Sequence, residues 1–484
     1  MQAKRKRPAL LAPTEQPPRK LSGTQDRPGP TIWRVAPGKA PTEGEADAVR
    51  PSSQVTGQMG FRRRMAADHI ACLERILMPR IAIVGAGITG VTSAYALCRA
   101  GYDVTVVDRQ PYPAMETSYA NGGQLSASNA EVWNSAATLA KGLRWMFRRD
   151  APLLVNPAPS WHKYSWLARF AAAVPGYRRN TVETVRLAIA AREHLFRMAE
   201  EEGIDFDLER RGILHIYGDA ASFAAARRVN ALLREGGLDR REVGAEEIRS
   251  LEPAMRQPVH AGFYTPSDST GDIHKFTRGL AEACRRRGVA FVQDAEVERI
   301  QPHGGGYRLA LRRPQGADGL DAQAVVVCAG SYSRGLAAQL GDDVPTYPVK
   351  GYSITVQLHD EASVAAAPWV SLLDDAAKIV TSRLGRDRFR VAGTAEFNGY
   401  NRDIRADRIA PLVAWTRRWF PEVATDRVVP WSGLRPMLPD MMPTVRPGRR
   451  PGVFYNTGHG HLGWTLSAAT AGMLAECVGA ALPA

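Results

Sequence analysis

A glycine-rich turn between an apolar strand and a helix, close to residue 80, most constrains the fold of this chain. Residues 80–84 read RIAIV and predict a buried strand, and residues 85–90 read GAGITG. A second apolar strand is expected over 103–107, and it runs directly into Asp108. This order of elements predicts a Rossmann-type dinucleotide site. It consists of a strand, a Gly-x-Gly-x-x-Gly turn, a helix and a second strand that ends in an acid.

Each part of this unit has a physical task. Gly85 permits the tight turn, Gly87 lets a pyrophosphate approach the backbone, and Gly90 brings helix and strand close together. The N-terminus of the helix stabilises phosphate charge, and Asp108 can accept hydrogen bonds from a ribose. The alternative is a glycine-rich turn in another α/β protein. The fingerprint by itself is compatible with either NAD or FAD.

The composition is that of an ordinary globular protein. Of the 484 residues, 44% are hydrophobic and 23% are charged, and the length predicts two or three domains. The five cysteines are scattered, without a Cys-x-x-Cys pair or a metal-ligand spacing, so we expect a reducing compartment and no metal site. No run of about 18 strongly apolar residues occurs, and a membrane span is therefore not expected.

Positive charge is concentrated at the N-terminus. Residues 1–77 hold 14 Lys and Arg against 7 Asp and Glu, while the whole chain carries +14. The segment is rich in Pro, Arg, Ser, Thr and Gly and lacks periodicity, so we expect a disordered extension. Met78 directly precedes the first strand. We therefore interpret residues 1–77 as a dispensable tail, or as the result of a start codon placed too early. No nucleic-acid partner is expected, because no basic helix with interleaved aromatics occurs; a tail that binds nucleic acid is the alternative.

Further strands predict that the nucleotide domain is interrupted and resumed. Residues 323–331 form an apolar strand with a small-residue turn, and a second strand–glycine turn–helix unit begins at Val453. Alternating strands dominate 346–430 and predict an antiparallel sheet. We expect an α/β fold in which a Rossmann-type domain is interrupted by an α+β substrate domain. The expected ranges are 78–170, 265–345 and 430–484 for the nucleotide domain, and 171–264 and 346–429 for the substrate domain.

Two aromatic-basic patches stand out in a region that is expected to be mainly helical. They are RWMFRR at 144–149 and WHKYSW at 161–166. Helix packing with solvated charges is the favoured interpretation. The alternative is shallow attachment to an anionic membrane surface.

Six segments carry a resemblance to a known family, and they occur in the same order as in that family, from Met78 almost to the chain end. They are 84–94, 106–111, 116–124, 347–353, 431–437 and 456–465. Together they resemble the flavin-dependent D-amino-acid oxidase superfamily. More closely, they are similar to the small subunit of the bacterial D-amino-acid dehydrogenases. The chain departs from that pattern in residues 1–77 and in stopping at Ala484, where a short further tail is expected.

The resemblance implies FAD as the cofactor, held in a three-layer ββα domain with a parallel sheet. Non-covalent binding is favoured, because no Cys lies between 329 and 476 and no His between 70 and 161, while the C-terminal histidines have no such role in the family. The residues expected to bind FAD are Ile83, Val84, Gly85, Ala86, Gly87, Ile88, Thr89, Gly90, Asp108, Arg109, Thr117, Ser118, Gly122, Gly123, Gln124, Val297, Ala329, Gly330, Gly458, Gly460, His461, Gly463 and Thr465.

The implied reaction is the oxidative deamination of D-amino acids, D-alanine among them, to 2-oxo acids and ammonia. A hydride passes from Cα to FAD, and the electrons continue to a quinone-type acceptor. Arg435 matches the carboxylate-binding arginine of the superfamily, and its planar guanidinium suits a bidentate contact. Lys350 and Tyr352 are candidates for the polar edge of the flavin and for the substrate pocket, and a structural role in a strand stays open for both.

The glycine turn near His461 would supply a backbone acceptor for the substrate amine. His461 is a candidate catalytic residue because histidine titrates near neutrality. If Cα–H leaves as a hydride, however, no base is needed at Cα. We therefore expect His459 and His461 to shape the pocket.

Another enzyme class stays open beside this one: a glycine- or sarcosine-type amine oxidase that uses oxygen. The expected compartment is the bacterial cytoplasm, with peripheral attachment to the inner face of the plasma membrane as the alternative.

Overall fold

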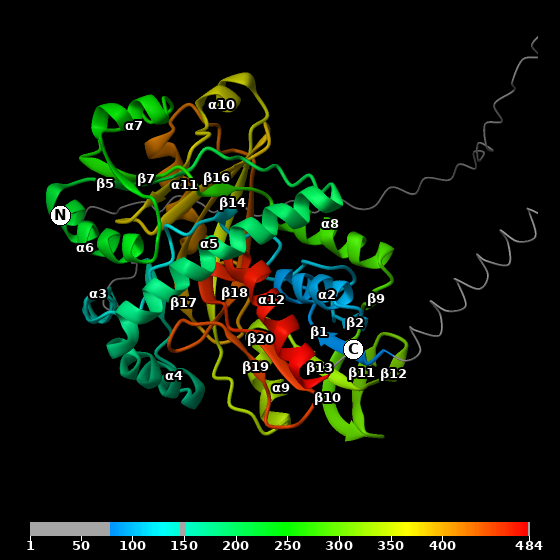
Figure 1. The fold of residues 1–484 in the computed structure, drawn as a ribbon. Helices are drawn as coiled ribbons and strands as arrows, with labels where there is room; N and C mark the ends of the chain where they lie inside the picture. Colours follow the sequence, from blue (N-terminus) through cyan, green and yellow to red (C-terminus); the bar gives the residue numbers. More distant parts are fainter. Residues whose placement is uncertain (1–77, 146–151, 483–484) are drawn as a thin grey trace, which may run out of the picture. The chain divides into compact units, whose positions relative to one another are not determined.

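The computed structural model describes residues 78–145 and 152–482, without the side chains of Lys141 and 143–145. The extension 1–77 and most of the patch at 144–149 lie outside the described residues. Two large sheets, one of six strands and one of nine, organise this part of the chain (Figure 1).

The six-stranded sheet has the order β19-β20-β13-β1-β2-β9. All of its pairings are parallel except the antiparallel pairing of β19 with β20. Its strands come from separate stretches of the chain, as the sequence predicts for an interrupted nucleotide domain. They are β1 (Arg80–Val84), β2 (Asp103–Val107), β9 (Ala290–Val292), β13 (Ala324–Val327), β19 (Thr444–Pro447) and β20 (Val453–Thr457).

Different layers cover the two faces of this sheet (Figure 1). Helices α2 (Ile88–Arg99), α8 (Ile273–Arg286) and α12 (Gly463–Ala481) share one apolar core with the side chains of β1. On the other face lies an antiparallel sheet of β10 (Glu296–His303), β11 (Gly306–Arg313) and β12 (Gly316–Ala322), with α9 (Ser333–Gln339) beside it. Because each face of a parallel sheet must be buried, two covering layers result. The predicted three-layer ββα domain is confirmed.

The nine-stranded sheet is largely antiparallel, which confirms the predicted substrate-domain sheet. Helix α11 (Ala406–Trp419) packs Leu412 and Trp415 against it. In order, the strands are β18 (Val428–Met437), β14 (Tyr347–Gln357), β17 (Arg388–Phe397), β16 (Ile379–Leu384), β15 (Ser371–Asp374), β5 (Ile213–Tyr217), β7 (Ala261–Thr265) and β6 (Arg241–Gly244), with β4 (Leu153–Val155) paired to β17.

Shorter elements and the remaining helices connect the sheets. Side chains at their N-termini explain where several helices begin, since Ser160 and Asp219 accept hydrogen bonds from the first turns of α4 and α6. The remaining elements are α3 (Ala136–Trp145), α4 (Trp161–Ala172), α5 (Tyr177–Glu202), α6 (Ala220–Glu235), α7 (Ala245–Leu251), α10 (Glu361–Ala366), β3 (Gln124–Leu125), β8 (Ser269–Thr270) and 3₁₀ turns at Val174–Gly176, Gly330–Tyr332 and Gly460–Leu462. Among the described helices, none combines the length and the apolar composition needed to cross a bilayer.

The expected domain ranges differ from the packing at two places. Strand β18 pairs with β14 over its whole length, so the expected boundary at residue 430 falls inside the nine-stranded sheet. Helix α5 was expected in the substrate domain, yet Leu195 and Ala199 near its C-terminus pack with α2, α8 and α12. Helix α5 has 26 residues, a length of about 39 Å that can reach both regions. We therefore propose a division that assigns β18 to the substrate domain and the end of α5 to the nucleotide domain.

The contact between α2 and β1 yields a prediction about Gly90. A Cβ atom at Gly90 would lie 1.8 Å from the carbonyl oxygen of Gly85, and this atom cannot move without opening the turn. Gly90→Ala is therefore expected to lower the free energy of unfolding by about 3 kcal/mol, measured by urea denaturation of the cofactor-free protein. Gly472→Ala in α12 is the matched control, because its Cβ would meet nothing within 4 Å. Equal stability of Gly90→Ala and wild type would contradict this packing.

Candidate active site

A cavity of about 1170 Å³ lies at the carboxyl ends of the parallel strands, where open α/β sheets bind ligands. Val84 and Val107, the last residues of β1 and β2, line it on one side. Gly351 and Gly393 of the nine-stranded sheet line it on the other side. Its volume exceeds that of many small-molecule pockets and suits a dinucleotide together with a substrate.

The glycine turn forms one end of the cavity. Gly85 has a φ of +110°, a region that glycine adopts without strain, and its N–H donates to the Val107 carbonyl at 2.8 Å. A Cβ atom at Gly87 would find its nearest neighbour, Ser118 Oγ, at 3.5 Å. The space above Gly87 is thus open to a ligand and not filled by protein. This geometry fits a pyrophosphate at the N-terminus of α2.

Asp108 is held in a fixed orientation at the end of β2. Its Oδ2 accepts a hydrogen bond from the Ala86 N–H at 2.5 Å, and its Oδ1 accepts one from the Gln110 N–H at 2.8 Å. Burial raises the pKa of Asp108, although these two donors oppose the rise. Each carboxylate oxygen has a second lone pair, so Asp108 can also accept from ribose hydroxyls.

Most of the residues predicted to bind the cofactor border this cavity. Four of them lie behind its wall: Ile83, Ala86, Gly90 and Gly458. The others line it directly, and they are Val84, Gly85, Gly87, Ile88, Thr89, Asp108, Arg109, Thr117, Ser118, Gly122, Gly123, Gln124, Val297, Ala329, Gly330, Gly460, His461, Gly463 and Thr465. Their individual contacts with a cofactor stay predictions.

Arg435 lies in the same cavity, on strand β18 of the substrate sheet. Its guanidinium rests on the backbone of Gly351, where a Cβ atom would come within 2.5 Å of Arg435 Cζ, and its Nη1 donates to the Thr394 carbonyl at 3.0 Å. Within the described residues no carboxylate pairs with it. Burial lowers the pKa of Arg435 to about 10, so it stays charged at neutral pH. A buried cation without a carboxylate partner is prepared for an anionic ligand.

Lys350 does not border the cavity. Its Nζ donates to Asn401 Oδ1 at 2.7 Å and lies 3.4 Å from Glu396 Oε1. The Tyr352 hydroxyl donates to Glu396 Oε2 at 2.6 Å, and its ring belongs to the core around Leu412, although the residue touches the cavity wall. Side chains alternate between the two faces of a strand. The side chains of Lys350 and Tyr352 therefore point to the face opposite the one on which Gly351 lines the cavity. For Lys350 the geometry favours the structural role.

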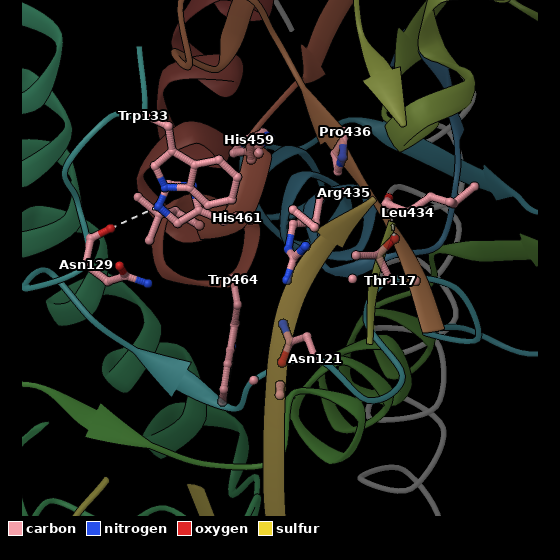
Figure 2. Close-up of a pocket in the computed structure, with 18 of the residues that line it drawn as sticks. Thr117, Asn121, Asn129, Trp133, Leu434, Arg435, Pro436, His459, His461 and Trp464 are labelled. Carbon is pink, nitrogen blue, oxygen red and sulfur yellow. Dashed lines mark hydrogen bonds between the residues drawn. The ribbon is translucent and has the colours of Figure 1, made fainter. Parts of the chain in front are cut away.

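The C-terminal glycine turn places two uncharged histidines in the site. His461 stacks on Trp133 with ring centroids 4.7 Å apart, and its Nε2 donates to the Asn129 carbonyl at 3.0 Å, which leaves Nδ1 as a buried acceptor without a partner in the described chain (Figure 2). His459 Nε2 lies 2.9 Å from Thr470 Oγ1. Burial lowers the pKa of each histidine to about 4, and for His461 the charge of Arg435 adds to this effect.

In Figure 2, Arg435 points into the space between His461 and Asn121. The sequence analysis did not single out Trp133, because residues 130–200 were expected to be mainly helical, whereas the structure has no helix in that range before Ala136. It did not single out Asn129 either. No local pattern marks Trp133 as a site residue. Only its stacking on His461 does so.

Comparison with known proteins agrees with this geometry. Residues 80–477 match the family model described as FAD dependent oxidoreductase. The chain belongs to this family. It is 62% identical to "D-amino acid dehydrogenase 3" of Mesorhizobium japonicum, across 84% of this chain and 98% of the relative. It is 43% identical to the D-amino acid dehydrogenase of Dechloromonas aromatica, with the same coverage. The predicted resemblance to D-amino-acid dehydrogenases is confirmed.

Solved structures of two other oxidases share the fold. Glycine oxidase from Geobacillus kaustophilus superposes with a TM-score of 0.65 at 21% identity, covering 83% of this chain and 95% of that one. L-α-glycerophosphate oxidase from Mycoplasma pneumoniae with FAD bound has a TM-score of 0.61 at 17% identity, covering 83% and 94%. The family model confirms FAD as the cofactor.

Gly87 offers a test of where FAD binds. Gly87→Ala is expected to weaken FAD binding at least roughly tenfold, because its methyl group would occupy the space next to the pyrophosphate. The stability of the FAD-free protein should change little, since the nearest atom to that methyl lies 3.5 Å away. Flavin fluorescence titration measures the first quantity and urea denaturation the second. Undiminished FAD affinity would place the pyrophosphate elsewhere.

The buried histidines predict a pH dependence of stability. As pH falls from 6.5 to about 4, unfolded chains protonate at positions 459 and 461 while the folded protein does not. The unfolded state then binds more protons, so the free energy of unfolding should fall by roughly 2 kcal/mol per histidine between pH 7 and pH 5. Urea denaturation at both pH values measures this fall. It should be smaller in His461→Gln and unchanged in the control His194→Gln, whose side chain is exposed.

Proposed function

We propose that the protein catalyses oxidative deamination of D-amino acids, D-alanine among them, to 2-oxo acids and ammonia. One observation carries the proposal: a buried guanidinium, Arg435, faces the same cavity as the dinucleotide turn and has no carboxylate partner among the described residues. The relatives named D-amino acid dehydrogenases support the substrate class.

The residues around Arg435 suit an α-amino acid. The substrate carboxylate would bind the guanidinium, which presents parallel N–H donors. The unpartnered Nδ1 of His461 is a neutral acceptor for an amino N–H, so it would hold the amine after this group has lost its ammonium proton to solvent. These two contacts would fix Cα and the orientation of its hydrogen. When bound, FAD would supply the acceptor for the hydride that leaves Cα, and the imino acid left behind would add water and release ammonia.

FAD would be held by the turn at Gly85–Gly90, by Asp108 and by the loops at 117–124, 329–330 and 460–465. We propose that it binds without a covalent bond. Of the described cysteines, Cys328 borders the cavity, and it lies at the end of β13 beside the glycine turn. Burial raises the pKa of Cys328 to about 12, so it stays an unreactive thiol.

A quinone-type electron acceptor, reached at the inner face of the bacterial plasma membrane, is part of the same proposal. Helix α4 supports it by exposing Trp161 and Tyr164, whose side chains are 83% and 47% accessible. Its buried Trp166 donates to the Met437 carbonyl at the end of strand β18, which carries Arg435. An exposed aromatic surface therefore lies on a helix attached to the active-site strand, and aromatic side chains favour membrane interfaces.

Reduction of the flavin under anaerobic conditions tests the function. D-alanine should bleach the bound FAD, whereas L-alanine and sarcosine should not, and a quinone should reoxidise it faster than air.

In Arg435→Met, kcat/KM for D-alanine should fall by roughly 10²–10³, because the substrate carboxylate loses its charged partner. Arg427→Met, an exposed arginine before the same strand, is the control.

Two outcomes would contradict this function. Faster reduction by sarcosine or glycine, with rapid reoxidation in air, would favour the amine oxidase. Unchanged kcat/KM in Arg435→Met would remove Arg435 from substrate binding.

The tail at 1–77 is tested separately. Its deletion should leave turnover intact, and loss of a salt-sensitive nucleic-acid affinity on deletion would support the alternative of a nucleic-acid-binding tail.

A further inference from the structure

The side chain of Arg435 reaches across a neighbouring strand. Arg435 belongs to β18, which pairs with β14, and β14 pairs in turn with β17. The guanidinium lies over Gly351 of β14, and its Nη1 donates at 3.0 Å to the carbonyl of Thr394 on β17. Within the described chain the Arg435 side chain makes no other hydrogen bond. Backbone groups of two other strands therefore hold the end of this side chain.

A β-bulge presents the Thr394 carbonyl to Arg435. The register of the pairing between β14 and β17 shifts by one residue at this point. Two residues of β17, Thr394 and Ala395, there face the single residue Gly351 of β14. The extra residue of a bulge is left unpaired in the ladder. The carbonyl of Thr394 can therefore accept a hydrogen bond from a side chain.

Thr394 adopts a backbone conformation that its own side chain opposes. Its φ is +62°, and it is the only β-branched residue among the described non-glycine residues of positive φ. Its Oγ1 is buried and has no hydrogen-bond partner in the described chain. Both properties lower stability, since a strained backbone and an unsatisfied buried hydroxyl are each unfavourable. Strain of this kind collects at functional sites, and Thr394 borders the cavity.

Gly351 leaves the space in which the guanidinium lies. A Cβ atom at this position would come within 2.5 Å of both Cζ and Nη2 of Arg435. These atoms are the far end of a flexible side chain, so an added methyl group would displace the guanidinium and leave the strand in place. At Gly90, in contrast, the added atom would meet backbone that cannot give way. The absence of a side chain at Gly351 thus serves the position of Arg435 more than the stability of the sheet.

We infer that Gly351 and the bulge at Thr394 form a seat that fixes the Arg435 guanidinium for carboxylate recognition, so that both are positioning residues. The inference rests on the proposed function, because that function makes Arg435 the partner of the substrate carboxylate. A two-point contact between a guanidinium and a carboxylate requires alignment of the two planar groups. The seat supplies this alignment before a substrate binds, which reduces the ordering that binding requires.

A double-mutant cycle tests whether Gly351 acts through Arg435. With the FAD-loaded full chain, Gly351→Ala should lower kcat/KM for D-alanine at least roughly tenfold, because the displaced guanidinium no longer meets the carboxylate. In the Arg435→Met background the same substitution should change kcat/KM by less than about twofold. Gly218→Ala, after β5 of the same sheet, is the control, since its Cβ would meet nothing within 4 Å. Additive losses in the double variant would overturn the inference.

Deletion of Thr394 tests the bulge. Without the extra residue β17 can pair regularly with β14, so the Tm should not fall, but the carbonyl that holds Arg435 is lost. Propionate is D-alanine without its amino group, and its binding is measured by perturbation of the flavin absorption spectrum. It should bind at least roughly tenfold more weakly to the deletion variant and to Gly351→Ala than to wild type. Thr394→Gly keeps the carbonyl and relieves the strain, so it should retain the wild-type affinity and have a higher Tm.

The propionate titration separates the inference from the proposed function. If the affinities change as expected while no D-amino acid reduces the flavin, the deamination function fails and the seat stands. If D-alanine is oxidised and neither Gly351→Ala nor the deletion weakens propionate binding, the inference is wrong. An equal loss of affinity in Thr394→Gly and in the deletion variant would also overturn it, because the carbonyl would then not account for the effect. Thermal unfolding and FAD content verify that each variant is folded.

Discussion

The close approach of helix α2 to strand β1 is the contact on which the rest of the site depends. The backbone of Gly90 meets that of Gly85 at a distance that leaves no room for a Cβ atom. This contact brings the N-terminus of α2 to the carboxyl end of β1, beside Asp108. The neighbouring parallel strands end at the same edge, so their loops join one cavity. A single backbone contact thus aligns the amides at the N-terminus of α2 with the carboxylate of Asp108, the groups predicted to bind phosphate and ribose.

Buried positive charge organises the opposite wall of that cavity. Exposed pairs such as Arg227 with Glu242 contribute little to stability, because water screens them. Arg435 differs from them, since it is enclosed by protein and has no carboxylate partner in the described chain. The protein keeps this cation at a cost in folding free energy that an anionic ligand offsets.

The parts of the fold that were predicted correctly are those with local signals. The strand at 80–84, the glycine turn and the repeated strand–turn–helix unit after Val453 follow from spacing within a few residues. The placement of Lys350 was not predictable in this way. Alternation along β14 puts Lys350 and Tyr352 on the same face, but the packing of α11 decides that this face is the core. Arg240, within the run DRRE, has the pattern of a solvated surface until the packing of Phe263 buries it.

The sequence by itself therefore determined the strand–turn–helix geometry at Gly85–Gly90 and predicted a dinucleotide site there, because the steric demands of that turn involve only neighbouring residues. It also indicated Arg435 through its resemblance to a known motif. Only the tertiary structure decided which charged side chains share the cavity, since desolvation of a charge depends on elements from distant parts of the chain. His461 shows this most clearly: it becomes a neutral acceptor because Trp133, Asn129 and Arg435 surround it.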